Sequence, residues 1–534
     1  MHEVNAPYNS QIIPPTSNPQ WDADILNPKG EQTEFYKQEP TESSWLRRHK
    51  KPVVATIVVA VILSIAVPLG IILPQESNAQ RQQLREQENE SNPSNPTSGH
   101  GHKVDDYDYF NNSARPNLLT PPLTEPFEYG KQKIRGVNIG GWLVTEPFIT
   151  PDLFDQFAAS DNIVDEWSLC KKLGPEEAER QLKEHYETFI TEDDFRKIAE
   201  MGLNHVRIPT GHWAVQVTPD EPYVPHLSWT YLLKGVQWAR KYGLRVMVEL
   251  HTAPGSQNGW NHSGHKGKIG WLNGPEGEAN AERTMKIIQN MTDFFSAPEW
   301  ANVAPIFGVL NEPAIYRLPS KKRVKEWYQT SYDMIRNSAP AGGPLLTYHE
   351  GFLGMPEWNG FFTEHNKRVI LETHNYLIFD QGLVSMNRES QAAFPCGSWR
   401  SDLGQAMKDV GPTMVGEFSV ATNDCGKYLN GVGLGTRMEG TFEEDGVKKP
   451  PVCPTCNCQA MEDWTTWDDG YKRFLKSFAE RQMDAFETSY GWFFWTYKTQ
   501  NHANPHWDYL LGWEQGWIPK DANHRESSCT DTGL

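Results

Sequence analysis

The chain lacks an excess of positive charge. Among its 534 residues, 50 are Lys or Arg and 68 are Asp or Glu, so the formal net charge is −18. Binding to nucleic acid requires a basic face that neutralises phosphates, so this composition excludes nucleic acid as a partner.

Two kinds of pattern are also missing from the sequence. No repeat of fixed period is present, which disfavours solenoids and propellers. No His-Glu-x-x-His motif or comparable ligand set is present, which disfavours a metal-dependent hydrolase. We therefore expect neither a metal nor another cofactor.

One long apolar run is present, at residues 53–73, and it contains no charged residue. Its length suffices to span a bilayer as a helix. The basic cluster at 47–51 precedes it, so the positive-inside rule places the N-terminus in the cytoplasm. We predict a single-pass type II signal anchor with the bulk of the chain outside the cell. A cleaved signal peptide is the alternative, disfavoured because about 50 residues precede the run.

The segments on either side of this run are polar and lack apolar periodicity. Residues 1–52 are rich in Pro, Asn, Gln and Glu, and we interpret them as a disordered cytoplasmic tail. Residues 74–115 form a low-complexity stretch that indicates a flexible stalk. The remaining residues, 116–534, are predicted to form one large folded domain.

Cysteines are few, and all seven follow the predicted membrane segment, where an oxidising compartment favours disulfides. The three cysteines at 453–458 lack the second half of a zinc site, so disulfides are the favoured interpretation. Seven is an odd number, and Cys170, in an amphipathic helical pattern, is our candidate for a buried free thiol. The sequence does not determine the pairing; our working hypothesis joins Cys396 to Cys529 and Cys425 to one cysteine of the cluster.

Sequons and aromatic residues both fit an exposed domain. Aromatic residues make up 12% of the chain and include 20 Trp. Flat aromatic faces commonly stack on sugar rings, but we expect about half of the Trp residues to lie in the core. Four Asn-x-Ser/Thr sequons predict glycosylation at Asn89, Asn111, Asn261 and Asn290.

Short strand-like segments alternate with helical patterns from about residue 130 onward. The helical patterns include residues 192–201, 229–242 and 471–486. Eight alternations over about 400 residues predict an α/β fold, a (β/α)8 TIM barrel with long loops. The predicted strands are 134–138, 205–208, 245–250, 305–310, 345–348, 369–371, 413–415 and 491–495.

Two glutamates follow predicted strands four and seven. Glu312 lies in Val-Leu-Asn-Glu-Pro, and Glu417 lies in Met-Val-Gly-Glu-Phe-Ser. Barrel strands carry reactive groups at their C-terminal tips, and two carboxylates in one pocket are the equipment of a glycosidase. Either glutamate alone could be a surface residue at a strand end. Neighbouring strands, however, also end in polar or aromatic residues, which are Arg207, His251, Asn311, His374, Tyr376 and Trp495.

The sequence blocks around these residues resemble the fungal exo-β-1,3-glucanases of glycoside hydrolase family five, through nearly all of 130–520. Asn-Glu-Pro alone indicates only the wider clan of retaining barrel glycosidases. More specific are Arg-Gly-Val-Asn-Ile-Gly-Gly-Trp, opening at 135, and Leu-His-Thr-Ala-Pro-Gly-Ser-Gln-Asn-Gly, ending at 259. The chain departs from the family at 497–500, where Tyr-Lys-Thr-Gln replaces Trp-Lys-Thr-Glu, and at Trp260, where Phe is usual. The predicted anchor suits the membrane-bound branch of the family.

The resemblance implies roles for the site residues. Glu312 is expected to be the acid/base and Glu417 the nucleophile, with the Arg207 cation keeping Glu417 ionised. Asn311 is expected to bind the sugar 2-hydroxyl. The other expected contacts are His374 and Tyr376 beside the nucleophile, Glu146 and His251 on the terminal glucose, Trp495 as its stacking floor, and Trp260 and Phe379 as a clamp for the next sugar.

The expected function is retaining hydrolysis of terminal glucose from the non-reducing ends of β-1,3-glucan in cell-wall remodelling. We expect a monomer anchored in the cell membrane and facing the wall. Three alternatives stay open: another β-glycan such as β-1,6-glucan or an endo-acting cleft, glucosyl transfer to a sugar acceptor, and a carbohydrate-binding module without catalysis. The last would predict loss of Glu312 or Glu417, and both are present. Long loops near 150–175 and 425–465 could close one end of the groove, which would favour exo-action.

Overall fold

The computed structural model describes residues 110–339, 343–363, 366–444, 446–448 and 450–531. Within these ranges, parallel strands close into a barrel in the order β1-β10-β7-β6-β5-β4-β3-β2, as predicted. The predicted tail, the predicted membrane segment at 53–73 and residues 74–109 of the stalk lie outside the described residues. Inside the described ranges, no helix is both long enough and apolar enough to cross a bilayer.

Most of the barrel strands begin where the apolar pattern places them, but several end later than predicted. β6 and β7 run past their apolar portions into Glu372–Asn375 and Gly416–Phe418, segments that carry the polar side chains of Glu372, His374 and Glu417. Because polar side chains point into the barrel near the strand ends, the apolar pattern in the sequence stops before the backbone pairing between strands does. The strands are β1 (Ile134–Asn138), β2 (His205–Thr210), β3 (Arg245–Leu250), β4 (Ile306–Gly308), β5 (Leu345–His349), β6 (Val369–Asn375), β7 (Thr413–Phe418) and β10 (Gly491–Phe494).

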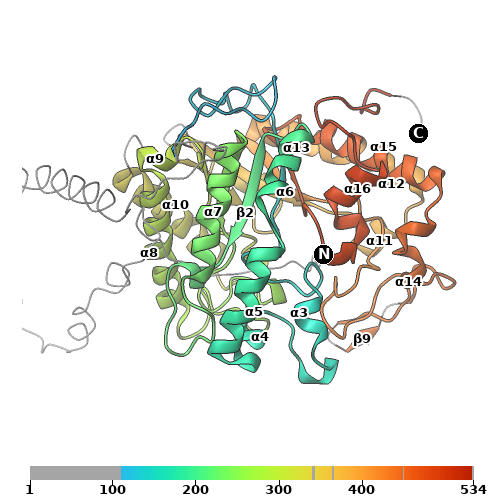
Figure 1. Cartoon of the computed structure of the whole chain (residues 1–534), viewed down its shortest axis with the longest axis horizontal. Coiled ribbons are helices and arrows are strands. Elements are labelled where there is room, and N and C mark those ends of the chain that lie inside the picture. Colours follow the sequence, from blue (N-terminus) through green and yellow to red (C-terminus); the bar gives the residue numbers. More distant parts are fainter. Residues whose placement is uncertain (1–109, 340–342, 364–365, 445, 449, 532–534) are drawn as a thin grey trace, which may run out of the picture. The chain divides into compact units, whose positions relative to one another are not determined.

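Helices cover the outside of the barrel (Figure 1). α7 packs against β2 and β3 and contacts α5 and α6. The three predicted helices are present as α6, α7 and α15, with ends shifted by one or two residues. The α-helices are α3 (Asp152–Asp155), α4 (Glu166–Leu173), α5 (Pro175–Thr188), α6 (Glu192–Glu200), α7 (Leu227–Lys241), α8 (Gly277–Phe295), α9 (Pro298–Ala301), α10 (Lys321–Ser338), α11 (Gln381–Val384), α12 (Arg388–Phe394), α13 (Arg400–Asp409), α14 (Cys458–Met461), α15 (Asp469–Phe486) and α16 (Tyr509–Gln515).

The barrel interior changes from apolar to polar along the strands. Alternate residues of a strand share a face, so each inward row can be read directly from the sequence. On β3 the row is Met247, Glu249 and then His251. The apolar end is a buried cluster with members on seven strands, closed from outside by Phe127; the strand members are Ile134, Met247, Ile306, Leu345, Ile370, Met414 and Phe493. Polar side chains occupy the barrel interior at the carboxyl-terminal ends of the strands.

The segment before β1 is packed against the barrel. Asn112 accepts a hydrogen bond of 2.6 Å from Arg240 Nη1, and the Arg240 guanidinium also lies over the Phe110 ring. The Arg115 backbone leaves no room for a Cβ at Gly243, where φ is +71°. The folded domain therefore extends back to Phe110, into residues that the sequence had assigned to the stalk.

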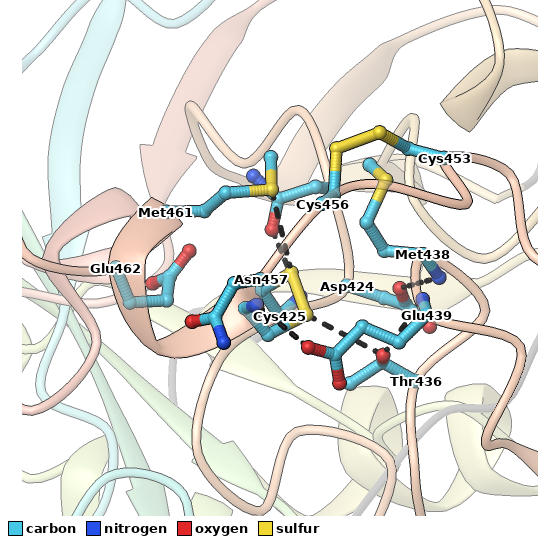
Figure 2. Close-up of a disulfide and its surroundings, with 12 residues drawn as sticks. Asp424, Cys425, Thr436, Met438, Glu439, Cys453, Cys456, Asn457, Met461 and Glu462 are labelled. Carbon is cyan, nitrogen blue, oxygen red and sulfur yellow. Dashed lines mark hydrogen bonds between the residues drawn. A yellow bond between two sulfur atoms is a disulfide. The ribbon is translucent and has the colours of Figure 1, made fainter.

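Three disulfides cross-link the described residues. Cys396 pairs with Cys529 and Cys425 with Cys458, in agreement with the working hypothesis, and Cys170 is a buried free thiol. The third bond, Cys453–Cys456, was not predicted. The long loop after β7 carries two of these bonds (Figure 2) and a small antiparallel hairpin, β8 (Glu443–Glu444) with β9 (Val447–Lys448).

Among the described residues, twelve of the chain's 20 tryptophans are buried, in line with the expectation that about half lie in the core. Of the predicted glycosylation sites, Asn111 and Asn290 are exposed and Asn261 is half-buried. Asn89 lies outside the described residues. Glycosylation at these four positions stays a prediction.

Candidate active site

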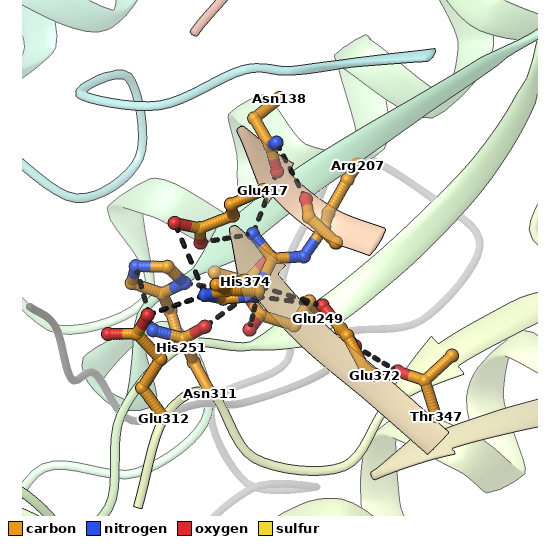
Figure 3. Close-up of polar contacts among 12 residues, drawn as sticks. Asn138, Arg207, Glu249, His251, Asn311, Glu312, Thr347, Glu372, His374 and Glu417 are labelled. Atoms are coloured by element: carbon orange, nitrogen blue, oxygen red, sulfur yellow. Dashed lines mark hydrogen bonds and ion pairs between the residues drawn. The ribbon is translucent and has the colours of Figure 1, made fainter. Parts of the chain in front are cut away.

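Arg207, the third residue of β2, is the centre of the site (Figure 3). Its side chain is fully buried. Nη1 donates to Asn138 at 2.7 Å and to Glu417 at 2.8 Å. Nη2 donates to Glu249 at 2.7 Å and to Asn311 at 2.8 Å. One guanidinium therefore fixes side chains from β1, β3, β7 and the residues after β4, as its rigid fork of donors allows.

Glu417, on β7, is held by two donors. Its Oε1 accepts from Arg207, and its Oε2 accepts from the Tyr376 hydroxyl at 2.8 Å. Burial raises the pKa of Glu417, while the Arg207 charge and the Tyr376 hydroxyl lower it. Both contacts favour the ionised carboxylate, the form that a nucleophile requires.

Glu312 follows β4 with a left-handed backbone, φ +41°. A non-glycine residue in this region carries strain that surrounding contacts must hold, and Asn258 Nδ2 donates to the Glu312 carbonyl at 3.3 Å. The side chain turns inward, where Oε1 lies 2.5 Å from His374 Nδ1. Burial raises the pKa of Glu312 well above its usual range, and the Glu417 charge raises it further. Both effects favour a protonated acid.

The two glutamates share one neighbour, which limits the distance between them. His374 Nδ1 lies 2.5 Å from Glu312 Oε1 and 3.4 Å from Glu417 Oε2. These two oxygens therefore cannot be farther apart than the sum of the two distances, 5.9 Å. Retaining glycosidases place their carboxyls about 5–5.5 Å apart and inverting ones about 6.5–9.5 Å apart. The geometry fits the retaining arrangement.

Further predicted residues surround this pair. His251 Nδ1 lies 2.6 Å from Glu249 Oε2, and its ring is parallel to that of Trp495 at 5.6 Å between centroids. Asn311 Nδ2 points to His251 Nε2 at 3.5 Å. Glu146, after β1, is 2% exposed, and burial followed by the Glu417 charge raises its pKa well above its usual range. Glu146 is therefore buried within reach of the Glu417 charge.

The proposed clamp residues have different neighbours. Trp260 is half-buried and packs edge-to-face with Phe352 at 5.8 Å, whereas Phe379 packs edge-to-face with Tyr376 at 5.7 Å. No ring contact joins Trp260 to Phe379 in the part of the chain that the structure describes. Trp260 lies in the loop after β3 and Phe379 in the residues after β6, and their role as a clamp stays a prediction.

Three side chains place potential metal ligands within 4.8 Å of one another: Glu312, His349 and His374. His349 Nδ1 accepts a hydrogen bond of 3.0 Å from the Gly351 N–H, so in the neutral ring Nε2 carries the proton. A protonated nitrogen has no lone pair for a metal. His374 Nδ1 is already engaged by Glu312. The donor set therefore fits a hydrogen-bonded cluster better than a metal site.

Three polar residues of the site were missed by the sequence reasoning, namely Asn138, Glu249 and Glu372. Asn138 is the last residue of β1, and its amide also donates to the Gly416 carbonyl at 3.0 Å. The glutamates stand two residues before His251 and His374 and so share their strand face. The Glu-x-His spacing is visible in the sequence, and a strand period of two identifies both glutamates as neighbours of the histidines on the same face.

Loops after β1, β7 and β10 are joined on one side of the mouth. Lys427 Nζ lies 2.5 Å from Asp155 Oδ2, and the Tyr428 hydroxyl donates to Asp155 Oδ1 at 2.8 Å. The Asn504 side chain accepts from the Lys427 N–H at 2.6 Å and donates to the Phe148 carbonyl. These contacts join the loops that follow β1, β7 and β10, and the loop after β1 also carries Glu146.

Comparison with known proteins agrees with this arrangement. Residues 171–432 match the family model for cellulase (glycosyl hydrolase family 5). A protein of Aspergillus terreus, named probable glucan 1,3-beta-glucosidase D, is 43% identical over 430 residues, which cover 79% of this chain and 51% of that protein. A protein of the same name from Aspergillus niger is 38% identical over 527 residues, which cover 92% of this chain and 63% of that protein. The chain thus spans only about half the length of the first relative.

A solved structure gives independent support for the fold. A rutinosidase from Aspergillus niger aligns with a TM-score of 0.55 at 20% identity, covering 74% of this chain and 99% of that one.

Proposed function

We propose that the chain is a retaining glucan 1,3-beta-glucosidase of glycosyl hydrolase family 5. The match of residues 171–432 to that family model and the 43% identity with a relative of that name support the proposal. The enzyme would release terminal glucose from the non-reducing ends of β-1,3-glucan during cell-wall remodelling. The observation that carries the proposal is the contact of both Glu312 and Glu417 with one nitrogen of His374. A non-catalytic sugar-binding protein would have no need of a strained, buried carboxyl pair.

The proposed reaction has two steps. Glu417 attacks the anomeric carbon while Glu312 gives its proton to the departing glycosidic oxygen, leaving glucose bonded to Glu417. Glu312, now ionised, then takes a proton from water, and the resulting hydroxide displaces Glu417 from the anomeric carbon. Arg207 and the Tyr376 hydroxyl stabilise the Glu417 carboxylate before the attack and after its release.

The substrate contacts of the proposal follow the positions of the remaining side chains. Glu146 and His251 would bind hydroxyls of the terminal glucose, with Trp495 as its stacking surface. Asn311 would bind the 2-hydroxyl, and His374 would orient the pair of carboxyls. Trp260 and Phe379 would flank the next sugar. The contacts that join the loops around Asp155 and Asn504 support exo-action over an open cleft, because joined loops would close the groove beyond the terminal glucose.

The location of the enzyme is also a proposal. The uncharged run at 53–73, preceded by basic residues, supports a single-pass type II anchor with the barrel outside the cell and facing the wall. Three disulfides in the described domain suit that oxidising side. We propose a monomer, since one chain supplies every residue of the site.

The test compares products on laminarin, pustulan and cellulose. The native chain should release glucose from laminarin with retained configuration. Glu417→Gln should lose activity by at least about three orders of magnitude, since a nucleophile is removed, and Glu312→Gln by about 10²–10⁴-fold. A preference for pustulan would mean that the enzyme cleaves β-1,6 rather than β-1,3 linkages. Native activity in Glu417→Gln would show that Glu417 is not the nucleophile.

A further inference from the structure

Strands β3 and β6 end in the same pattern, Glu-x-His. Glu249 precedes His251 and Glu372 precedes His374, and Figure 3 shows all four side chains gathered around Arg207. His251 Nδ1 lies 2.6 Å from Glu249 Oε2, and His374 Nε2 lies 3.2 Å from Glu372 Oε1. The proposed reaction uses the histidines and gives these glutamates no part.

The next strand makes room for each glutamate with a glycine. A Cβ at Gly416 on β7 would lie 1.9 Å from Glu372 Oε1, and a Cβ at Gly308 on β4 would lie 2.5 Å from Glu249 Cγ. Neither glycine has a backbone that itself requires glycine, since no positive φ occurs at either position. The space that the buried carboxyl groups of Glu249 and Glu372 require explains why positions 308 and 416 are both glycine.

Hydrogen-bond partners fix the tautomer of His251. The Asn311 amide oxygen accepts from Arg207, so its NH₂ group points to His251 Nε2 at 3.5 Å. Nε2 is therefore the acceptor and Nδ1 carries the proton that is donated to Glu249.

The same argument gives His374 the opposite tautomer. Glu372 Oε2 accepts from the Thr347 hydroxyl at 2.6 Å, and its Oε1 faces His374 Nε2. If Nε2 carried no proton, its lone pair would face a carboxyl oxygen at 3.2 Å with no hydrogen between them. A neutral His374 therefore carries its proton on Nε2 and has a lone pair on Nδ1.

That lone pair determines where the proton lies in the contact with Glu312. His374 Nδ1 and Glu312 Oε1 are 2.5 Å apart, and such a contact needs one hydrogen between the two atoms. With Nδ1 as the acceptor, Glu312 must be the donor. The other oxygen, Glu312 Oε2, is buried without a hydrogen-bond partner among the described residues. Oε1 therefore carries the acid proton, and that proton leaves the contact with His374 when Glu312 protonates a glycosidic oxygen.

We propose that Glu372 is a positioning residue that, by accepting the Nε2 proton of His374, fixes the tautomer that keeps the acid proton on Glu312. This rests on the proposed function only for the role of Glu312; the tautomer itself can be measured without a substrate. Other charged or titratable groups also lie near Glu312 or act on it from the surrounding strands, namely Arg207, Glu249, His349, Tyr376 and Glu417.

The direct test is nitrogen NMR of the full chain labelled with ¹⁵N-histidine, without substrate. The His374 signals, assigned by their loss in His374→Gln, should show a protonated Nε2 and an unprotonated Nδ1. Glu372→Gln should shift the population toward protonated Nδ1, because an amide NH₂ can donate to Nε2. A native His374 protonated on Nδ1, or on both nitrogens, would overturn the proposal whatever the substrate of the enzyme is.

The second test is the pH profile of kcat/KM on laminarin, with Glu249→Gln as the matched control. Both variants remove one buried carboxyl near Arg207, but only Glu372→Gln alters the partner of His374. Loss of a hydrogen bond to a charged group predicts that the basic limb moves toward lower pH by about one to two units in Glu372→Gln. The control should move less. Equal shifts would show a simple charge effect and refute the tautomer role.

A milder variant guards against failure to fold. Thr347→Val keeps the Glu372 carboxyl but removes its hydroxyl donor, and it should shift the basic limb in the same direction by a smaller amount. An unchanged basic limb together with an unchanged His374 tautomer in this variant would contradict the proposal. A native chain inactive on laminarin would refute the proposed function, and the NMR result would still decide the tautomer.

Discussion

The centre of the barrel and the loop after β7 are held together by different means. Around Arg207, side chains from several strands are joined by hydrogen bonds between charged groups, with a guanidinium and carboxyls that are at most 5% exposed. The loop at 419–468 has little regular structure and carries two disulfides instead. Figure 2 shows the Cys425 sulfur beside Met461, with Thr436 and Glu439 on the other side of the bond.

The difference follows from what each region must do. The strands already fix the backbone at the centre, so charged side chains can be buried there in one geometry and used for chemistry. The loop has few strands or helices to fix it, and a covalent bond restricts its unfolded state. Removing one charged partner at the centre should therefore cost more than removing a cross-link in the loop.

Replacing Arg207 by Met is expected to have the largest effect on stability. The substitution leaves Glu249, Glu372 and Glu417 buried without their cation, which costs about 3–5 kcal/mol. Laminarin hydrolysis should fall by at least about a hundredfold, since Glu417 loses its alignment. Urea unfolding and steady-state kinetics measure both. The control, Arg207→Lys, keeps the positive charge but not the planar guanidinium, so its stability and its activity should lie between those of the native chain and the Met variant. If the Met variant were as stable as the native chain, the barrel centre would not differ from the loop in the way described.

Removing the Cys425–Cys458 bond should have a smaller effect, confined to stability. The bond closes a loop with a sequence separation of 33 residues. The chain-entropy model gives about 3–4 kcal/mol for a loop of this length. The double variant Cys425→Ser with Cys458→Ser should unfold at lower urea concentration while kcat stays within about twofold of native, since neither sulfur touches the site. A large loss of kcat would show that this loop shapes the site more than its contacts suggest.

The barrel strands and the catalytic pair were predictable because short apolar runs bounded by polar residues are a local signal. The polar interior was harder to predict. Glu372 lies in the extension of β6, where inward-facing polar residues interrupt the apolar pattern, and its partners Thr347 and Gly416 come from other strands. Such partners become neighbours only when the barrel closes.

The disulfides show the same limit. Two pairings agreed with a working hypothesis, but Cys453–Cys456 depends on a local turn, in which the Cys456 N–H donates to the Cys453 carbonyl at 3.1 Å. The membrane segment, the tail and the four glycosylation sites stay predictions, because apolar length, composition and sequons are their only support.

A buried carboxyl away from the site should make stability depend on pH. Glu166 on α4 accepts from the Thr145 N–H at 2.8 Å and from its hydroxyl at 3.0 Å. Burial raises the pKa of Glu166 to about 8, although the two hydrogen bonds from Thr145 act to lower it. Because this is above the value of about 4.3 for an unfolded chain, the folded state binds more protons between those pH values, and stability falls as pH rises through that range.

The test of this dependence is Glu166→Gln. The variant should lose a slope of up to about 1.4 kcal/mol per pH unit between pH 5 and 8, and it should gain stability relative to native as pH rises. Urea unfolding across that range measures the slope, and Glu179→Gln, an exposed position on α5, is the matched control. An unchanged slope in Glu166→Gln would mean that Glu166 is ionised in the folded chain.

The smallest effect is expected for the Cys453–Cys456 bond, which makes it the sharpest test of the contrast within the loop. The bond closes a separation of three residues, and the turn hydrogen bond between the same residues already restricts that segment. The neighbouring backbone is also fixed, since the Val452 and Cys453 N–H groups donate to the Arg437 and Met438 carbonyls, each at 3.1 Å. The double serine variant should therefore lose only about 1 kcal/mol or less, because little loop entropy remains to be restored.

Comparison with the Cys425–Cys458 variant separates two explanations of the loop's stability. If chain entropy dominates, the longer bond must matter more, and the two costs should differ by about 2 kcal/mol or more. Equal costs would mean instead that each bond stabilises the loop through its local packing, as Met461 and Thr436 do around the longer one. The loop would then depend on close side-chain contact just as the barrel centre does, and the difference between the two regions would lie only in charge.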